Sequence, residues 1–275
     1  MTTTFAGLSL AEPLFMGVVN ATPDSFSDGG DAFSEKDAVA RGLALMEAGA
    51  AIIDVGGEST RPGAEVVSPN EEIRRTEPVI RSLSEAGAVV SIDTRNAETM
   101  RRAIAAGATI VNDVTALTHD PLALETVAES GACVMLMHMQ GEPQTMQANP
   151  IYDDVVTDVL RYLQDRATAC AAAGIAVSKI AIDPGIGFGK TVAHNLRLLR
   201  HLDLFVRTGY PVVLGVSRKS FIAKLSQGEE PKERISGSVA AAIAGLQAGV
   251  QIYRVHDVAE TRQAFAIWRA IAAAH

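Results

Sequence analysis

Short apolar runs alternate with longer segments of helical periodicity along almost the whole chain, and this alternation restricts the fold more than any other feature. Eight such pairs can be counted. The expected strands cover residues 15–19, 51–53, 89–92, 109–111, 132–137, 179–182, 211–214 and 251–255. The expected helices cover residues 35–48, 69–86, 97–106, 122–130, 152–173, 192–201, 235–248 and 258–273. Short apolar strands between helices are typical of a parallel sheet with both faces covered.

The length of the chain then favours one closed domain. Eight strand–helix units in 275 residues most simply form a single-domain α/β fold, a (β/α)8 TIM barrel spanning residues 1–275. Glycine-alanine pairs at 49–50, 107–108 and 131–132 precede strands and fit short turns from helix to strand. No linker, charge run or low-complexity segment divides the sequence. An open doubly wound sheet is the alternative.

Composition excludes several classes of function. A net charge of −8 and a pI near 5.3 disfavour sequence-independent nucleic-acid binding, which depends on basic surface. No apolar run reaches about 18 residues, so we expect no membrane span. The first residues lack the basic and apolar parts of a signal peptide, and a cytoplasmic protein is expected. Cys133 and Cys170 are too few for a disulfide framework or a zinc site, and we expect both to be core or helix residues.

Nearly every expected strand ends on an ionisable or amide side chain. These residues are Asn20, Asp54, Asp93, Asn112, His138, Asp183, the trio Ser217, Arg218 and Lys219, and the pair Arg254 and His256. In a barrel, the carboxyl ends of the strands and the loops after them build the active site. The acidic and amide side chains suit the edge of a planar heterocycle, and the basic ones suit an oxyanion or a phosphate. The sequence therefore predicts one pocket for both a planar ring and an anionic group.

The glycine-rich stretch 180–190 (IAIDPGIGFGK) needs separate treatment because it resembles a phosphate-binding loop. A Walker loop requires glycine five residues before Gly189, where this chain has Pro184, which has no N–H to donate. A dinucleotide fingerprint fails because Lys190 replaces its third glycine. An aspartate that ends a buried strand predicts a pocket at the strand terminus instead. A nucleophile elbow and a two-histidine metal pattern are both missing from the sequence, and His138, His194 and His201 are more simply structural.

The motifs that carry these residues resemble those of the dihydropteroate synthases, enzymes of the folate pathway. Two are long and specific, residues 16–30 (MGVVNATPDSFSDGG) and 53–63 (IDVGGESTRPG). The others follow in order: 91–94 (SIDT), 111–113 (VND), 136–141 (LMHMQG), 183–190 (DPGIGFGK), 217–220 (SRKS) and 254–257 (RVHD). Together they extend across almost the whole chain. Arg95 departs from the family, which often has a small or aromatic residue there, and its role is left open.

The resemblance implies a reaction in which 4-aminobenzoate displaces diphosphate from (7,8-dihydropterin-6-yl)methyl diphosphate to give 7,8-dihydropteroate. It implies binding of the pterin diphosphate by Thr60, Asp93, Asn112, Met137, Asp183, Phe188, Gly215, Lys219, Arg254 and His256. It implies binding of 4-aminobenzoate by Phe26, Arg61, Pro62, Ser217 and Lys219. The residues that it implies for catalysis are Asp93, Lys219, Arg254 and His256.

The resemblance also implies Mg²⁺ as cofactor, with Asn20 as a metal ligand, and a homodimer with small-molecule substrates. Within this group, Asp183 and Asn112 are expected at the pterin edge, while Arg254, His256 and Thr60 are expected on the diphosphate. Two other functions remain open. One is a pterin-binding methyltransferase domain, which shares the barrel, and the other is a non-catalytic folate-binding barrel.

Overall fold

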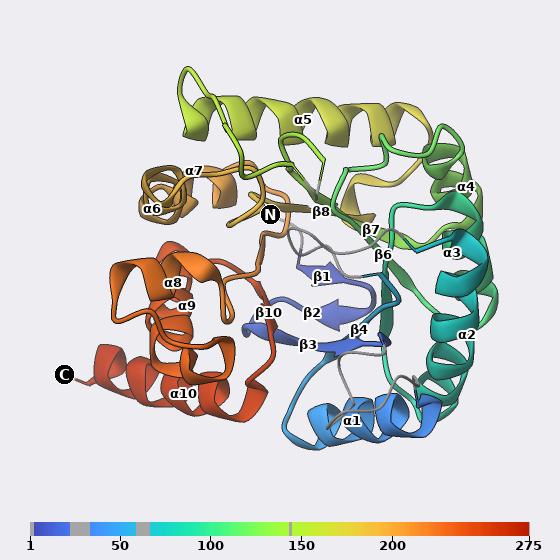
Figure 1. Cartoon of the computed structure of the whole chain (residues 1–275), viewed down its shortest axis with the longest axis horizontal. Coiled ribbons are helices and arrows are strands. Elements are labelled where there is room, and N and C mark those ends of the chain that lie inside the picture. The colour runs from blue at the N-terminus through green and yellow to red at the C-terminus, as the bar shows by residue number, and fades with distance from the viewer. Residues whose placement is uncertain (1–2, 23–33, 59–66, 143–144, 275) are drawn as a thin grey trace.

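A computed structural model describes residues 3–22, 34–58, 67–142 and 145–274 of the chain. It contains a parallel sheet of eight strands: β3 (Leu14–Asn20), β4 (Ile52–Gly56), β5 (Val90–Asp93), β6 (Ile110–Asp113), β7 (Cys133–Met137), β8 (Ile180–Asp183), β9 (Val213–Leu214) and β10 (Ile252–Val255). Helices surround the strands, as Figure 1 shows. They are α1 (Glu35–Glu47), α2 (Pro69–Glu85), α3 (Ala97–Ala105), α4 (Ala123–Ser130), α5 (Val155–Ala172), α6 (Val192–Arg200), α7 (Leu202–Val206), α8 (Ser220–Leu225), α9 (Ile235–Ala248) and α10 (Val258–Ala273).

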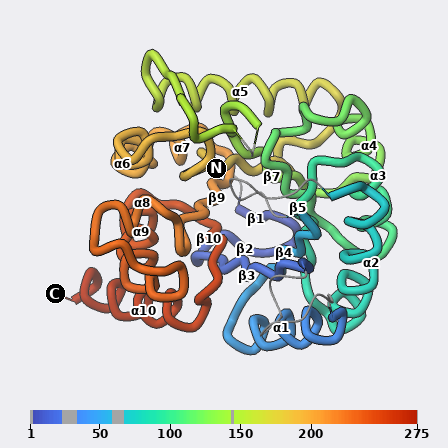
Figure 2. Tube along the Cα trace, in the orientation of Figure 1, coloured from blue at the N-terminus to red at the C-terminus, as the bar shows by residue number. Residues whose placement is uncertain are grey.

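The sheet closes into a barrel. Its strand order is β8-β7-β6-β5-β4-β3-β10-β9, so the last strands of the chain return beside the first, as the trace in Figure 2 shows. A parallel bridge between Ile182 and Val212 joins the two edges, and the Ile182 N–H donates to the Pro211 carbonyl at 2.9 Å. An open doubly wound sheet would keep these edges apart. The prediction of a (β/α)8 TIM barrel is therefore confirmed.

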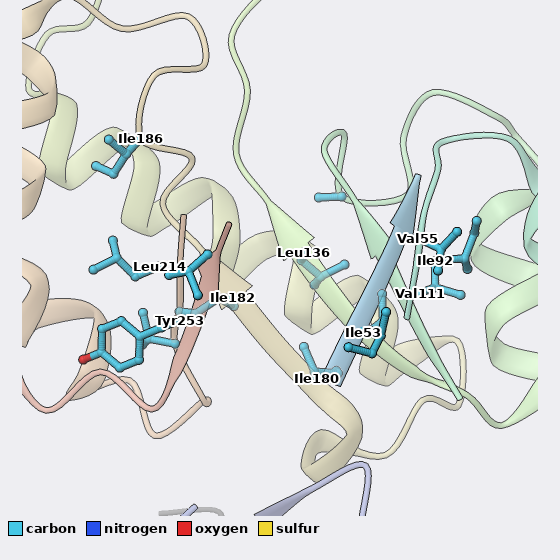
Figure 3. Packing of buried hydrophobic residues seen from close by; sticks show 14 of the residues in the cluster. Ile53, Val55, Ile92, Val111, Leu136, Ile180, Ile182, Ile186, Leu214 and Tyr253 are labelled. Carbon is cyan, nitrogen blue, oxygen red and sulfur yellow. The ribbon is translucent and has the colours of Figure 1, made fainter. Parts of the chain in front are cut away.

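Alternation along each strand divides the core into two apolar clusters. Successive side chains of a strand point to opposite faces. Outward-facing residues pack between the strands and the helices, and Figure 3 shows several of them: Ile53, Val55, Ile92, Val111, Leu136, Ile180, Ile182, Leu214 and Tyr253. Inward-facing residues fill the barrel itself: Met16, Ile52, Ile110, Cys133, Met135, Ala181, Val213 and Ile252. Cys133 and Cys170 are both buried, as expected for core residues.

Short elements and one helix start differ from the sequence-based expectation. The helix expected at 152–173 begins at Val155, because Asp154 caps it by accepting from the N–H groups of Val156 and Thr157. Two short helices, α7 and α8, were not expected, and neither was the antiparallel hairpin formed by β1 (Thr4–Phe5) and β2 (Leu8–Ser9). Within the described residues, no helix combines the length and apolar character needed to span a bilayer.

The hairpin completes the inner apolar cluster. Phe5 is 1% exposed and belongs to the same cluster as the inward-facing strand residues, with Ala6, Leu8 and Leu10 packed against it. The chain segment before the first barrel strand therefore covers the interior of the barrel. Figure 1 shows β1 and β2 in the middle of the ring of helices.

Replacement of Phe5 by alanine is expected to destabilise the whole barrel. Removal of a buried phenylalanine leaves a cavity and costs about 3–5 kcal/mol of the free energy of unfolding. Urea unfolding followed by circular dichroism measures this change. Leu122→Ala is the control, since Leu122 is 59% exposed and its replacement should change stability by less than about 0.5 kcal/mol. Equal stability of Phe5→Ala and the wild-type chain would show that the hairpin is only a surface attachment.

Candidate active site

Polar side chains lie directly above the apolar interior because each follows an inward-facing residue of its strand by two positions and so points to the same side. Asp54 lies two residues after the inward-facing Ile52, and the same spacing separates Ala181 from Asp183 and Ile252 from Arg254. Asn112, Met137 and Gly215 follow Ile110, Met135 and Val213 in the same way. Because all eight strands run parallel, these residues converge at the carboxyl end of the barrel.

A pocket opens at this end of the barrel. It is lined by Asp93, Asn112, Val114, Met137, Asp183, Gly185, Ile186, Phe188, Gly215, Lys219 and Arg254. Eight of these are among the residues that the family resemblance implies for the pterin site. The other three, Val114, Gly185 and Ile186, were not expected, because aliphatic side chains and glycine carry no chemical signal and the family resemblance did not include these positions.

Arg254 occupies the centre of an ion-pair network that the sequence did not reveal. Its Nε donates to Asp54 Oδ2 at 2.7 Å, and its Nη2 donates to Asp93 Oδ2 at 2.7 Å. Asn112 Nδ2 donates to the same Asp54 oxygen at 3.3 Å. Burial acts to lower the pKa of Arg254, but the charges of Asp54 and Asp93 outweigh it and raise the pKa above its ordinary value. Asp54, which is fully buried, therefore orients Arg254 and Asn112.

The carboxyl group of Asp93 has a pKa well above the ordinary range of an aspartate. Burial raises the pKa of Asp93 to about 7, with Arg254 acting against this rise and Asp54 adding to it. A carboxyl group that titrates near neutrality, next to a permanent cation, is typical of a functional site.

Asp183 is held at the end of β8 by the turn that follows it. The Gly185 N–H donates to Asp183 Oδ1 at 2.7 Å. Burial raises the pKa of Asp183, and the Gly185 N–H, Lys219 and Arg254 act in the opposite direction. Its other oxygen, Oδ2, lies 4.0 Å from where a Cβ would stand on Gly215, so a side chain at Gly215 would occupy the space in front of the carboxylate.

Apolar side chains form one wall of the pocket. Met137 and Phe188 belong to a small buried cluster with Val114 and Met146. The Lys219 ammonium lies 4.1 Å from the centre of the Phe188 ring, a cation–π contact that fixes both side chains. A flat aromatic ligand matches such a wall, with the acceptors of the network at its edge.

Ser217 and His256 meet at the ends of β9 and β10. Ser217 Oγ accepts from the His256 backbone N–H at 3.2 Å and lies 3.1 Å from His256 Nδ1. Arg218 has a left-handed backbone with φ +60°, and its guanidinium pairs with Asp257. Arg41 Nη2 donates to the His256 carbonyl at 2.9 Å. The structure thus joins a residue expected at 4-aminobenzoate to one expected at the diphosphate.

The remaining sequence-based expectations have mixed outcomes. Asn20 ends β3 in phase with the inward-facing Met16, so it faces the mouth of the barrel. The residues described contain no group of three His, Cys, Asp or Glu side chains that could hold a metal by themselves. Phe26, Thr60, Arg61 and Pro62 lie outside the described residues.

Two of the three histidines for which we favoured a structural role have clear local partners. His138 is buried and contacts Lys190, with its Nδ1 3.0 Å from Lys190 Nζ. His194 forms a capping box with Thr191 at the start of α6.

Comparison with known proteins agrees with this geometry. The family described as "Pterin binding enzyme" matches residues 16–256. Dihydropteroate synthase of Neisseria meningitidis serogroup B is 50% identical over 273 residues, covering 96% of this chain and 94% of the relative. The chain belongs to the dihydropteroate synthase family. The Escherichia coli K12 dihydropteroate synthase is 47% identical over 261 residues, covering 94% of this chain and 92% of the relative.

Solved structures of the same family superpose closely. Xanthomonas albilineans dihydropteroate synthase with 4-aminobenzoic acid has a TM-score of 0.91 and 48% identity, and the match covers 98% of this chain and 97% of that one. The Yersinia pestis dihydropteroate synthase, solved as a sulfonamide drug complex, has a TM-score of 0.91 and 45% identity, covering 97% of each chain.

The titration of Asp93 gives stability a defined pH dependence. The folded-state pKa of about 7 lies above the value of about 4 for an unfolded aspartate, so the folded chain keeps a proton that the unfolded chain releases. The stability from this proton is fully present below about pH 4 and is lost as pH rises to about 7. Asparagine does not titrate. The free energy of unfolding of the wild-type chain, minus that of Asp93→Asn, should therefore fall as pH rises through this window.

Urea unfolding of both proteins at several pH values between about 5 and 8 measures this difference. A constant difference across that range would show that Asp93 is already ionised in the folded chain at about pH 5.

Proposed function

We propose that this pocket catalyses the condensation of (7,8-dihydropterin-6-yl)methyl diphosphate with 4-aminobenzoate, giving 7,8-dihydropteroate and diphosphate. One observation carries the proposal. Asp93, Asn112 and Asp183 converge with Lys219 and Arg254 in one pocket of a chain that belongs to the dihydropteroate synthases. This is a step of folate biosynthesis, and it makes the chain a transferase.

The ring would be recognised by acceptors on one side and an apolar wall on the other. Asp183 offers a buried carboxylate that can accept two ring N–H groups at once, and Asn112 can both donate and accept. Met137 and Phe188 supply the wall, and Gly215 leaves room for a flat ligand in front of Asp183. The hydrogen-bond pattern of a pterin, with adjacent amino and ring N–H groups, fits this arrangement.

The diphosphate is proposed to lie at the mouth of the barrel, near Asn20 and His256, with Thr60 and Arg254 as further contacts. The residues present fit a magnesium ion only in part, because no cluster of acidic ligands is found among the described residues. Mg²⁺ usually takes one or two protein oxygens together with substrate phosphates. The amide oxygen of Asn20 and the diphosphate itself would supply this set, and the ion would neutralise charge on the leaving group.

The reaction needs no strong general base from the protein, because the arylamine is already nucleophilic. The amine nitrogen of 4-aminobenzoate forms a bond to the pterin methylene carbon while the bond from that carbon to the diphosphate oxygen breaks. The amine then loses a proton to water or to the released diphosphate. If the C–O bond breaks first, the resulting cation is delocalised into the pterin. Asp93 lines this pocket, and in its ionised form the carboxylate would stabilise the cation.

Lys219 and Ser217 are proposed to border the second substrate. Lys219 lines the ring pocket beside Phe188, and Ser217 contacts His256, so both stand between the proposed ring and diphosphate sites. Phe26, Arg61 and Pro62 are proposed to complete the 4-aminobenzoate site on the basis of the family resemblance. 4-Aminobenzoate bound between the ring site and the diphosphate site would have its amine next to the pterin methylene carbon.

Two features bear on assembly and location. Ile267 and Ile271 lie four residues apart on α10 and are 60% and 69% exposed. A pair of exposed isoleucines on one helix face supports the proposal of a homodimer formed through late helices. A cytoplasmic location is proposed on the ground that the similar proteins include bacterial dihydropteroate synthases.

The alternatives make different predictions. A methyltransferase domain would bind the pterin but would not need the basic group of Lys219, Arg254 and His256. A non-catalytic folate-binding barrel would bind the pterin without releasing diphosphate. Relatives of 46–50% identity named as dihydropteroate synthases favour the synthase over both.

Asp183→Asn tests the proposed ring recognition directly. The change places a partial donor opposite ring N–H groups and should weaken pterin binding by about 2 kcal/mol or more. Calorimetry with the pterin diphosphate measures this loss, and Asp37→Asn, an exposed aspartate on α1, is the matched control. Unchanged binding by folded Asp183→Asn would remove Asp183 from the ring site.

Turnover by the wild-type chain separates the synthase from the methyltransferase domain and the non-catalytic barrel. The wild-type chain, mixed with Mg²⁺, 4-aminobenzoate and the pterin diphosphate, should release diphosphate and form dihydropteroate, and chelation of Mg²⁺ should stop both. Pterin binding without product from the folded chain would contradict the synthase and leave the non-catalytic barrel and the methyltransferase domain.

A further inference from the structure

Lys190 is a buried cation that the proposed reaction does not use. Only 3% of its surface is exposed, and it ends the loop of residues 184–190 that follows β8. A buried lysine is costly unless its charge is compensated. Burial lowers the pKa of Lys190 to about 7, and the neighbouring Asp183 acts against this change.

Three acceptors converge on the Lys190 ammonium. Its Nζ lies 2.9 Å from the Phe188 carbonyl, 3.2 Å from the His138 carbonyl and 3.0 Å from His138 Nδ1. An ammonium has three N–H donors, so each acceptor can receive one. Burial, followed by the charge of Lys190, lowers the pKa of His138 to about 3. The imidazole is therefore neutral near pH 7, and its Nδ1 can accept.

These contacts join two segments that carry the wall of the ring pocket. His138 directly follows Met137 on β7, and its own N–H donates to the Asp183 carbonyl at 3.1 Å. Phe188, whose carbonyl Lys190 binds, lines the same pocket. Lys190 thus connects the backbone beside Met137 to the backbone of Phe188.

The glycines of the loop allow this close approach. A Cβ on Gly185 would stand 1.9 Å from the His138 carbonyl oxygen, and one on Gly189 would stand 2.3 Å from the Gln140 carbonyl oxygen. Both glycines have positive φ, +67° and +60°. The loop is therefore pressed against residues 138–140, and Lys190 binds in the contact.

We propose that Lys190 is a positioning residue whose ammonium fixes the loop after β8 to the end of β7 and thereby sets the ring-binding wall formed by Met137, Asp183 and Phe188. The inference rests on the proposed function, since it takes the pterin as the occupant of that wall. Lys190 would not touch the substrate. Its loss should weaken binding of the ring and leave binding of diphosphate nearly unchanged, because the diphosphate residues Asn20 and His256 lie on other strands.

The test compares Lys190→Met with the wild-type chain. Methionine has similar length but no donors, so three buried acceptors lose their partner. Fluorescence titration with 6-hydroxymethylpterin should show a loss of about tenfold in affinity. Calorimetry with inorganic pyrophosphate and Mg²⁺ should show a change within about twofold, and KM for the pterin diphosphate should rise more than kcat falls. Lys179→Met is the control, because Lys179 precedes β8, is half-buried, and donates its Nζ to the Gly131 carbonyl rather than to a residue of the ring pocket.

Several outcomes would overturn the inference. Pterin affinity of folded Lys190→Met within about twofold of wild type would do so, as would equal losses for pterin and pyrophosphate. If Lys190→Met does not fold, Lys190→Gln is measured in its place, since glutamine keeps N–H donors and should lose pterin affinity in the same sense. Failure of both variants to fold would show that Lys190 supports the whole barrel rather than the ring wall.

The proposed function fails separately. A wild-type chain that binds no pterin would contradict the function itself, whereas wild-type binding retained in Lys190→Met would contradict only the role of Lys190.

Discussion

The contact of Arg254 with Asp54 and Asp93 is the interaction on which the carboxyl end of the barrel depends. It joins β10 to β4 and β5, and Arg254 is 200 residues from Asp54 and 161 residues from Asp93 in sequence. Each carboxylate would be costly to bury without this cation, and the cation would be costly without them. The pair also positions Asn112 through Asp54, so both the charge and the hydrogen-bond pattern of the pocket follow from it.

The same arrangement gives the pocket both acidic and amide groups and a cation that lies over an aromatic ring. The carboxyl groups of Asp93 and Asp183 and the amide of Asn112 line the pocket above the apolar interior. Lys219 lines the same pocket, with its ammonium over the Phe188 ring. A planar ligand with N–H groups along one edge fits between them. Anionic groups would be repelled by the carboxylates of Asp93 and Asp183. A pterin that carries its diphosphate on a single methylene group has this polarity.

Much of the site could be predicted from the sequence because the strand–helix unit repeats along the chain and side chains alternate along each strand. Eight repeated strand–helix units indicated a barrel, and the barrel brings all strand ends to one face. Asp93, Asn112, Asp183 and Arg254 could therefore be grouped before their distances were known. Asp54 could not be given its role, since nothing local in the sequence shows that it pairs with a residue 200 positions later. The β1–β2 hairpin was missed because strands of two residues carry almost no periodic signal.

The glycine-rich loop shows where local motifs mislead. Its glycines and lysine resemble a phosphate loop, yet the structure uses Gly185 and Gly189 for close contact with residues 138–140 and Lys190 to bind carbonyl groups. These contacts depend on a neighbouring segment some fifty residues earlier, which no motif records. The loop therefore belongs to the wall of the ring pocket.

A crystal structure of the chain with (7,8-dihydropterin-6-yl)methyl diphosphate and Mg²⁺ tests the central claim most directly. The account predicts the pterin edge against Asp183 and Asn112, the ring beside Phe188, and the diphosphate at the mouth near Asn20 and His256. Density for the pterin ring outside this pocket, or with its diphosphate turned toward Asp183, would contradict it.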